Sequence, residues 1–241
     1  MKIINATWEI KNIGVKCNEI IIENDDCIEK IKNEIATYET EYTVVKIPVK
    51  KIDIMLWLQE MNFFFIEMTT SCQHIGNSFN LNRIQQRIID SLNYEEMSEM
   101  DVDYMYGEIR NCLFTTDRIA VDPYFTLQQA NNRYINWIKD ELKSGAKSYR
   151  VSHNQNQVGF FILKKNSERE WFAFLGGLYS SYLESGFGFS MNYFEVIEGQ
   201  KLGAKRILTS FSSNNRGAAA IHLNLGYNLL KQYYIFVKHK H

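Results

Sequence analysis

The chain lacks a run of basic residues. Its 27 Lys and Arg residues are balanced by 28 Asp and Glu residues, so the formal net charge is -1 over 241 residues. A near-neutral chain without a basic patch is poor evidence for nucleic-acid binding. A small anionic ligand stays open, because backbone N–H groups can bind one without a cationic side chain.

Cysteines are few and widely spaced. Cys17, Cys27, Cys72 and Cys112 form no C-x-x-C pair, and no known motif surrounds any of them. This spacing predicts neither a zinc site nor a disulfide framework, and it favours reduced thiols in a cytosolic protein. A reactive cysteine nucleophile is the alternative interpretation. We expect no bound metal.

Long apolar runs are missing as well. The most apolar short stretch, residues 62–66, is far too short to span a bilayer. The first 14 residues contain neither a continuous apolar segment nor a small-residue cleavage site. We therefore expect a cytoplasmic protein without a membrane partner.

The first half of the chain alternates strand-like and helix-like segments. Strands are expected at residues 19–23, 42–47 and 62–69, and helices at residues 27–36, 51–61 and 100–112. Asp25 and Asp26 precede the first of these helices and are candidates to cap it. The early β-α-β-α-β order favours a small α/β unit over a helical bundle. Phe63, Phe64 and Phe65 are interpreted as core rather than as a platform for stacking bases.

No Pro-, Gly- or Ser-rich linker divides the chain, although 45% of its residues are hydrophobic and can fill one large core or two small ones. We place a boundary at the turn-like residues 115–117. It separates an N-terminal α/β domain, residues 1–115, from a second domain, residues 116–241.

The second half has clearer periodicity. Helices are expected at residues 126–143, 188–202 and 215–225, and strands at 149–152, 157–164, 171–179, 206–212 and 227–238. Thr126 is a candidate helix cap, and Ser144 and Gly145 end that helix. Residues 154–156 form the turn of a hairpin.

Two glycines mark the connection between the predicted strand 171–179 and the helix that follows. Gly186 and Gly188 allow positive φ and a close approach of backbone to a ligand. The free N–H groups at the start of the helix, together with its dipole, favour a phosphate. A tight turn with no ligand is the alternative.

A second segment, residues 215–227, combines an Asn at a helix start with an alanine run and a terminal glycine. Asn215 either caps the helix or reaches a ligand, and the alanines make a slim helix that another molecule can approach closely. Gly226 ends the helix. An ordinary short helix is the alternative interpretation.

Together the two segments resemble the GNAT superfamily of acyl-CoA-dependent N-acyltransferases. The family's phosphate loop reads Gln/Arg-x-x-Gly-x-Gly/Ala, and its last motif reads Asn-x-x-Ala-x-x-(apolar)-Tyr-x-x-x-Gly-Phe/Tyr. The matching positions are Gly186, Gly188, Asn215, Ala218, Ile221, Gly226 and Tyr227. Leu183 replaces the polar first residue of the loop, and His222 stands where the family usually has Tyr.

The resemblance implies an α/β (α+β) fold with a mixed central sheet, and acetyl-CoA as co-substrate. The implied pyrophosphate loop consists of Leu183, Glu184, Ser185, Gly186, Phe187, Gly188 and Phe189. The backbone of Leu178 would polarise the thioester, and Asn215 and Ala218 would complete the cofactor site. His222 would protonate the departing thiolate, either with a pKa raised above its usual value or as a neutral N–H donor.

The acceptor is expected to be a small amine. Residues 118–123, 130–137 and 158–160 are similar to the nucleotide-sugar branch, which acetylates a dTDP-4-amino-4,6-dideoxy-galactose (dTDP-fucosamine). Arg118 could contact the phosphates of such an acceptor or be an ordinary surface residue. The general base stays open among Asp117, Asp122 and Glu184, or a water chain. Because Leu183 and His222 depart from the motifs, a non-catalytic acyl-CoA-binding module is the alternative function, and the oligomeric state is open.

Overall fold

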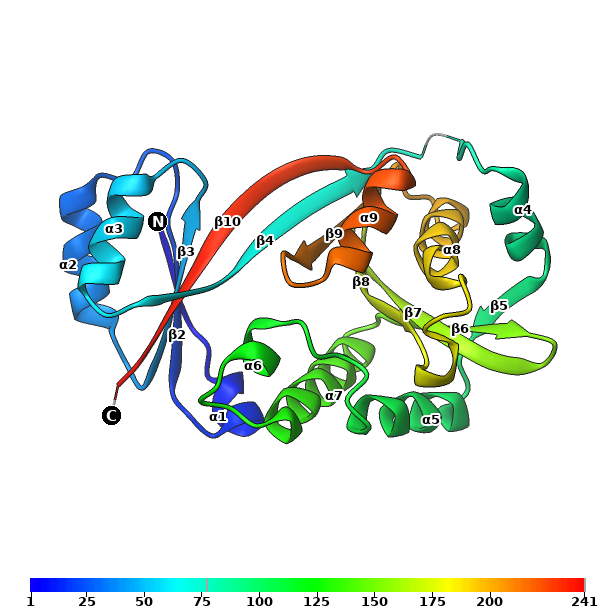
Figure 1. The fold of residues 1–241 in the computed structure, drawn as a ribbon, viewed down its shortest axis with the longest axis horizontal. Helices are drawn as coiled ribbons and strands as arrows, with labels where there is room; N and C mark the ends of the chain where they lie inside the picture. Colours follow the sequence, from blue (N-terminus) through cyan, green and yellow to red (C-terminus); the bar gives the residue numbers. More distant parts are fainter. Residues whose placement is uncertain (77, 241) are drawn as a thin grey trace.

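The computed structural model describes residues 1–76 and 78–240, and it arranges the described strands in one mixed sheet (Figure 1). The strand order is β1-β2-β3-β10-β4-β9-β8-β7-β6-β5. This confirms the predicted α/β class and the mixed sheet. No described helix is long and apolar enough to cross a membrane.

The N-terminal half of the sheet and its helices come from the first part of the chain. They are β1 (Lys2–Asn5), α1 (Trp8–Ile13), β2 (Cys17–Ile21), α2 (Ile28–Tyr38), β3 (Tyr42–Pro48), α3 (Ile52–Glu60) and β4 (Phe64–His74). The predicted cap by Asp25 or Asp26 is wrong. Cys27 precedes α2 in extended conformation, and no side chain caps the helix.

The remaining elements build the C-terminal half. They are α4 (Arg83–Asp90), β5 (Leu92–Glu96), α5 (Glu99–Arg110), α6 (Arg118–Val121), α7 (Leu127–Lys143), β6 (Lys147–His153), β7 (Asn156–Ser167), β8 (Glu170–Leu178), the 3₁₀ helix η1 (Ser180–Tyr182), α8 (Gly188–Lys201), β9 (Arg206–Ser212), α9 (Arg216–Asn224) and β10 (Asn228–His239). The predicted cap of α7 is confirmed, because the Thr126 side chain accepts from the backbone N–H of Gln129. Sequence patterns missed β1, α1, α4 and β5.

The two halves share one connectivity and exchange their last strands. The first half runs β2-α2-β3-α3-β4, the second β8-α8-β9-α9-β10, and the first two strands of each are parallel. β10 lies between β3 and β4, while β4 lies between β9 and β10, all antiparallel. Figure 1 shows these two long strands passing from one half to the other. Each half therefore needs a strand of the other to complete its sheet.

The division at residues 115–117 stays a prediction, but the sheet does not follow it. β4 pairs with β9, and β5 pairs with β6, so residues before position 116 supply two strands to the C-terminal half.

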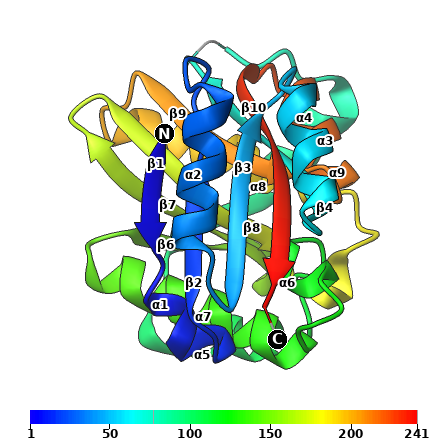
Figure 2. The ribbon, with the colours of Figure 1, turned by 90° about the vertical axis from the view of Figure 1, so that its left-hand side faces the viewer.

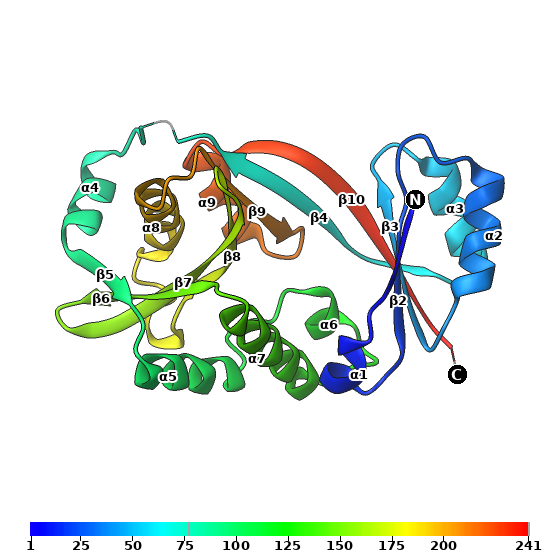
Figure 3. The same ribbon diagram turned by 180° about the vertical axis from the view of Figure 1, so that it is seen from behind.

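Helices cover both faces of the sheet. In β7, Phe160 and Ile162 pack with α5 and α7, whereas Phe161 and Leu163 pack with α8, as the alternation of a strand requires. In the N-terminal half, α2 and α3 cover one face (Figure 2). On the opposite side α1, α6, α7 and α5 form a row that joins the two halves (Figure 3).

Candidate functional site

The sheet is open between β8 and β9. In the described chain these parallel strands pair only from Glu170 to Phe172 on β8 with Arg206 to Leu208 on β9. One step further, the hydroxyl of Thr209 donates to the carbonyl oxygen of Ala173 at 3.0 Å. The C-terminal part of β8 then pairs with β7 alone. Backbone groups on the β9 side of β8 are therefore free to meet a ligand.

A cavity of about 330 Å³ occupies this opening. From the α8 and α9 side its wall contains Asn192, Glu195, Asn215, Ala218 and His222. From the α6 and α7 side it contains Asp117, Arg118, Arg133, Tyr134 and Trp137. Because these helices cover opposite faces, the cavity passes through the sheet and has walls on both faces.

The glycine loop lies at the N-terminus of α8. Gly186 has φ of 78°, and no side chain caps the first turn of the helix. An ideal Cβ on Gly188 would lie 3.4 Å from Ile221 Cδ1 and 3.8 Å from Leu178 Cδ1. The loop, the end of β8 and α9 therefore meet at Gly188. The N–H of Phe187 bonds to Ser185 Oγ and that of Ser190 to the carbonyl of Phe187, so the N–H groups of Gly188 and Phe189 at the helix start are the candidates for binding an anion next to the opening.

The other predicted cofactor residues lie around the same place. Asn215 caps α9, accepting from the backbone N–H of Ala218 at 2.9 Å, and both line the cavity. Leu178 ends β8 and is buried. Because the N–H of Tyr179 bonds to β7 and successive N–H groups alternate, the N–H of Leu178 points toward the open edge. Leu183 and Glu184 are exposed.

His222 lines the cavity with both ring nitrogens engaged. Nδ1 lies 2.7 Å from the carbonyl oxygen of Ala218, which can only accept, so Nδ1 carries the proton. Nε2 of the neutral ring then accepts from the amide of Asn192 at 3.1 Å. Burial lowers the pKa of His222. This direction does not favour the raised pKa considered for an acid role, and the N–H of the neutral ring already donates to Ala218.

Glu195, which the sequence patterns did not single out, faces the same cavity from α8. It is 2% exposed, and its Oε2 accepts from the amide of Asn192 at 3.0 Å. Burial raises the pKa of this carboxyl to about 8. An ideal Cβ on Gly176 would lie only 2.8 Å from Oε1, so the glycine makes room for the acid beside β8. In the sequence, Glu195 stands between the apolar residues Phe194 and Val196, and this was the signal that could have indicated a buried carboxyl.

Asn192 links the two titratable groups. Its side-chain nitrogen contacts both Glu195 Oε2 and His222 Nε2, so its two N–H bonds can serve one acceptor each. A protonated Glu195 then carries its hydrogen on Oε1, on the side of Gly176. This arrangement presents a buried proton donor to the open edge of β8.

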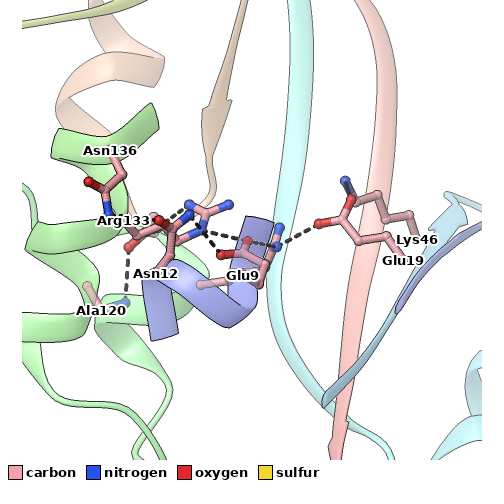
Figure 4. A network of polar contacts seen from close by, with 9 residues as sticks. Glu9, Asn12, Glu19, Lys46, Ala120, Arg133 and Asn136 are labelled. Atoms are coloured by element: carbon pink, nitrogen blue, oxygen red, sulfur yellow. Dashed lines mark hydrogen bonds and ion pairs between the residues drawn. The ribbon is translucent and has the colours of Figure 1, made fainter. Parts of the chain in front are cut away.

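Arg118 is buried rather than at the surface, which corrects one of the two interpretations of this residue. Its guanidinium lies 2.6 Å from Glu19 Oε1 and 3.4 Å from Glu9 Oε1. Arg133 contacts Glu9 at 2.8 Å, and Lys46 contacts Glu19 at 2.7 Å (Figure 4). The network ties α1 and β2 of the first half to α6 and α7 of the second.

Of the carboxylates considered as bases, Glu184 is exposed on the glycine loop, and Asp117 and Asp122 have partners. Asp117 caps α6 and lies 3.4 Å from Arg133. Asp122 is buried and lies 2.9 Å from His239. Neither is free to accept a proton without losing a partner.

The raised pKa of Glu195 predicts a specific pH dependence of stability. The folded chain keeps this proton up to about pH 8, whereas the unfolded chain releases it near 4.5. The stabilisation is therefore complete below 4.5 and is lost as the pH rises through about 8. We expect the free energy of unfolding of the wild type to fall, relative to Glu195→Gln, by about 1 kcal/mol per pH unit between pH 5 and 8. Urea unfolding of both proteins measures it, and parallel pH curves would contradict it.

Neither a family model nor a curated protein sequence matches the chain. Solved structures do. A GCN5-related N-acetyltransferase from Sphaerobacter thermophilus has a TM-score of 0.57 at 11% identity, covering 88% of this chain and 64% of that one. A tandem GNAT protein from the clavulanic acid biosynthesis pathway has a TM-score of 0.55 at 8% identity, covering 94% and 76%.

A glucosamine N-acetyltransferase region in a fungal multi-domain beta-N-acetylglucosaminidase has a TM-score of 0.64 at 7% identity. It covers 98% of this chain, which spans 31% of that one. At such low identities the likeness concerns the fold alone. The chain has the GNAT fold, and the likeness extends over both halves of its sheet. Among the described residues, no group of three or more His, Cys, Asp or Glu could hold a metal ion.

Proposed function

We propose that this chain is an acetyl-CoA-dependent N-acetyltransferase that transfers the acetyl group directly to a small amine. The observation that carries the proposal is the cavity through the sheet between β8 and β9. It offers a route for a thioester from the α8 face and for an amine from the α7 face. Holding both reactants in line supplies a large part of the rate of such a reaction.

The cofactor is proposed to bind on the α8 face. Residues 183–189 and the first turn of α8 are proposed to bind the pyrophosphate through backbone N–H groups. The pantetheine arm would run along the open edge of β8, past Ala218 and Asn215. The N–H of Leu178 would polarise the thioester carbonyl.

Glu195 is the proposed proton donor to the leaving thiolate. Its pKa of about 8 keeps it mostly protonated at neutral pH, close to the roughly 8.5 of a thiol. His222 stays in the proposed site with a different role. Its Nε2 fixes the amide of Asn192, which in turn orients Glu195, so His222 acts as a positioning residue.

The acceptor is proposed to be an amino sugar or another small amine. The nucleotide-linked 4-amino-4,6-dideoxy sugar rests on the sequence resemblance alone. The fungal neighbour is described as a glucosamine N-acetyltransferase, which makes simple amino sugars equally strong candidates. The alternative of a non-catalytic acyl-CoA-binding module rests on the replaced motif residues, Leu183 and His222.

Release of the CoA thiol from acetyl-CoA, measured against a panel of amines, tests the proposal. The panel contains glucosamine, a dTDP-4-amino-4,6-dideoxyhexose, spermidine and amino acids. We expect release with an amino sugar. Acetyl-CoA binding without release for any amine would favour the binding module, and failure to bind acetyl-CoA would overturn both.

A further inference from the structure

Part of the cavity wall lies on the face covered by α6 and α7, and the N-terminal half contributes to this part. Glu67 and Thr69 of β4 lie there with Asp117, Arg118 and Trp137. If acetyl-CoA occupies the α8 face, as proposed above, the acceptor must approach from this side. The following inference rests on that proposed function.

Charged side chains in this part of the wall are mostly paired with each other. Arg118 is held by Glu19 and Glu9, and Arg133 by Glu9 and Asp117. A charge that is already neutralised and hydrogen-bonded offers little to an arriving ligand. An amine therefore gains little by contacting any of these groups.

Glu67 differs from its neighbours. It is 5% exposed, lines the cavity, and its Oε2 has no hydrogen-bond partner among the described residues. Burial raises the pKa of this carboxyl, while a hydrogen bond with the Ser212 side chain and the positive charge of Arg118 act in the opposite direction. Leaving a buried carboxyl oxygen unpartnered is costly, so an N–H group brought by a ligand would be bound favourably. β4 places this side chain opposite the cofactor side of the opening.

We propose that Glu67 binds the reacting amine of the acceptor and takes its proton. The acceptor N–H bond breaks as an O–H bond forms on Glu67. The nitrogen electron pair forms the C–N bond, the C–S bond of the thioester breaks, and the thiolate takes the proton of Glu195. Solvent then returns one proton from Glu67 to Glu195, which restores both groups.

An adjoining cavity indicates the chemical class of the rest of the acceptor molecule. It has a volume of about 430 Å³ and shares Arg118, Arg133 and Trp137 with the first. Its wall contains three carboxylates and three cations, Glu19, Asp140, Glu141, Lys46, Arg118 and Arg133. Trp8 and Trp137 add rings that are 46% and 39% exposed. This balance suits a primary amine on a polar body without net charge, such as an unphosphorylated amino sugar, better than a polyamine or a nucleotide.

Glu67→Gln tests the proton transfer, with Glu60→Gln at the exposed end of α3 as the matched control. We expect Glu67→Gln to lower kcat/KM by about 100-fold at neutral pH, with activity recovering as the pH rises and the free amine fraction grows. Acetyl-CoA affinity should stay unchanged. A merely structural role would not produce this pH profile. Glu67→Asp, which keeps the carboxylate, should retain more activity than Gln.

If the wild type turns over and Glu67→Gln keeps full activity, the proposed role of Glu67 is overturned. If the wild type itself neither binds acetyl-CoA nor releases CoA, the proposed function fails instead. On the amine panel, a higher kcat/KM for glucosamine than for the nucleotide sugar and spermidine supports the acceptor class. A preference for either of the other two would overturn it.

Discussion

An Ala218→Phe variant is expected to bind acetyl-CoA about 10- to 100-fold more weakly than the wild type. Ala218 lines the opening between β8 and β9, where the pantetheine arm is proposed to lie. A phenyl ring would occupy that space, and overpacking of this kind costs about 1–3 kcal/mol, or about one to two orders of magnitude in affinity. Isothermal titration of both proteins with acetyl-CoA measures the difference.

Ala220→Phe is the matched control. Ala220 lies two residues further along α9 and is exposed, so the new ring points into solvent. The two variants carry the same change in helix propensity on the same helix. Equal acetyl-CoA affinities for the two variants, with both chains folded, would place the cofactor outside the opening.

Replacing Glu195 with Gln should lower kcat by about 100-fold or more while leaving the acetyl-CoA affinity nearly unchanged. Gln keeps the acceptor oxygen for Asn192 but has no proton to give to the thiolate. In the wild type we expect an alkaline limb of the pH–rate profile near the raised pKa of about 8, and this limb should be absent in Glu195→Gln. Steady-state rates across pH 6 to 9 measure both effects.

Glu198→Gln provides the comparison for this change. Glu198 lies one turn further along α8 and accepts from the hydroxyls of Tyr94 and Tyr149, away from the opening. We expect it to retain most of the wild-type kcat. If the two variants lost activity to the same degree, or if Glu195→Gln stayed fully active, Glu195 would not be the proton donor.

Local sequence patterns predicted the part of the fold that depends on local physics. The capping of α7 by Thr126, the cap of α9 that was one of two interpretations of Asn215, and the hairpin between β6 and β7 each depend on a few adjacent residues. Helix α3 was predicted from the spacing of its apolar residues. Such features are determined by propensity and turn chemistry, so they can be recognised without tertiary contacts.

The exchange of β4 and β10 could not be predicted from local sequence patterns. Their contacts join residues far apart in the chain, such as Gln232 and Thr70, which are separated by 162 positions. Arg118 was misjudged for the same reason, because its partners Glu9 and Glu19 lie 109 and 99 positions away. The proposed roles of Glu195 and Glu67 depend on burial that only the assembled sheet creates.

The pairing of the parallel strands in the first half bears on how many cofactors the chain can bind. β2 and β3 correspond to β8 and β9, but they pair from Cys17 to Ile21 and leave no comparable opening. The connection from β2 to α2 carries Glu23, Asp25 and Asp26 in place of glycines, which would repel a pyrophosphate. One acetyl-CoA per chain is therefore expected.

Titration of the wild-type chain with acetyl-CoA tests the central claim most directly. We predict saturable binding with one site per chain, competed by free CoA. The absence of binding would contradict the assignment of the β8 and β9 opening as an acyl-CoA site, and two sites per chain would contradict the closed first half.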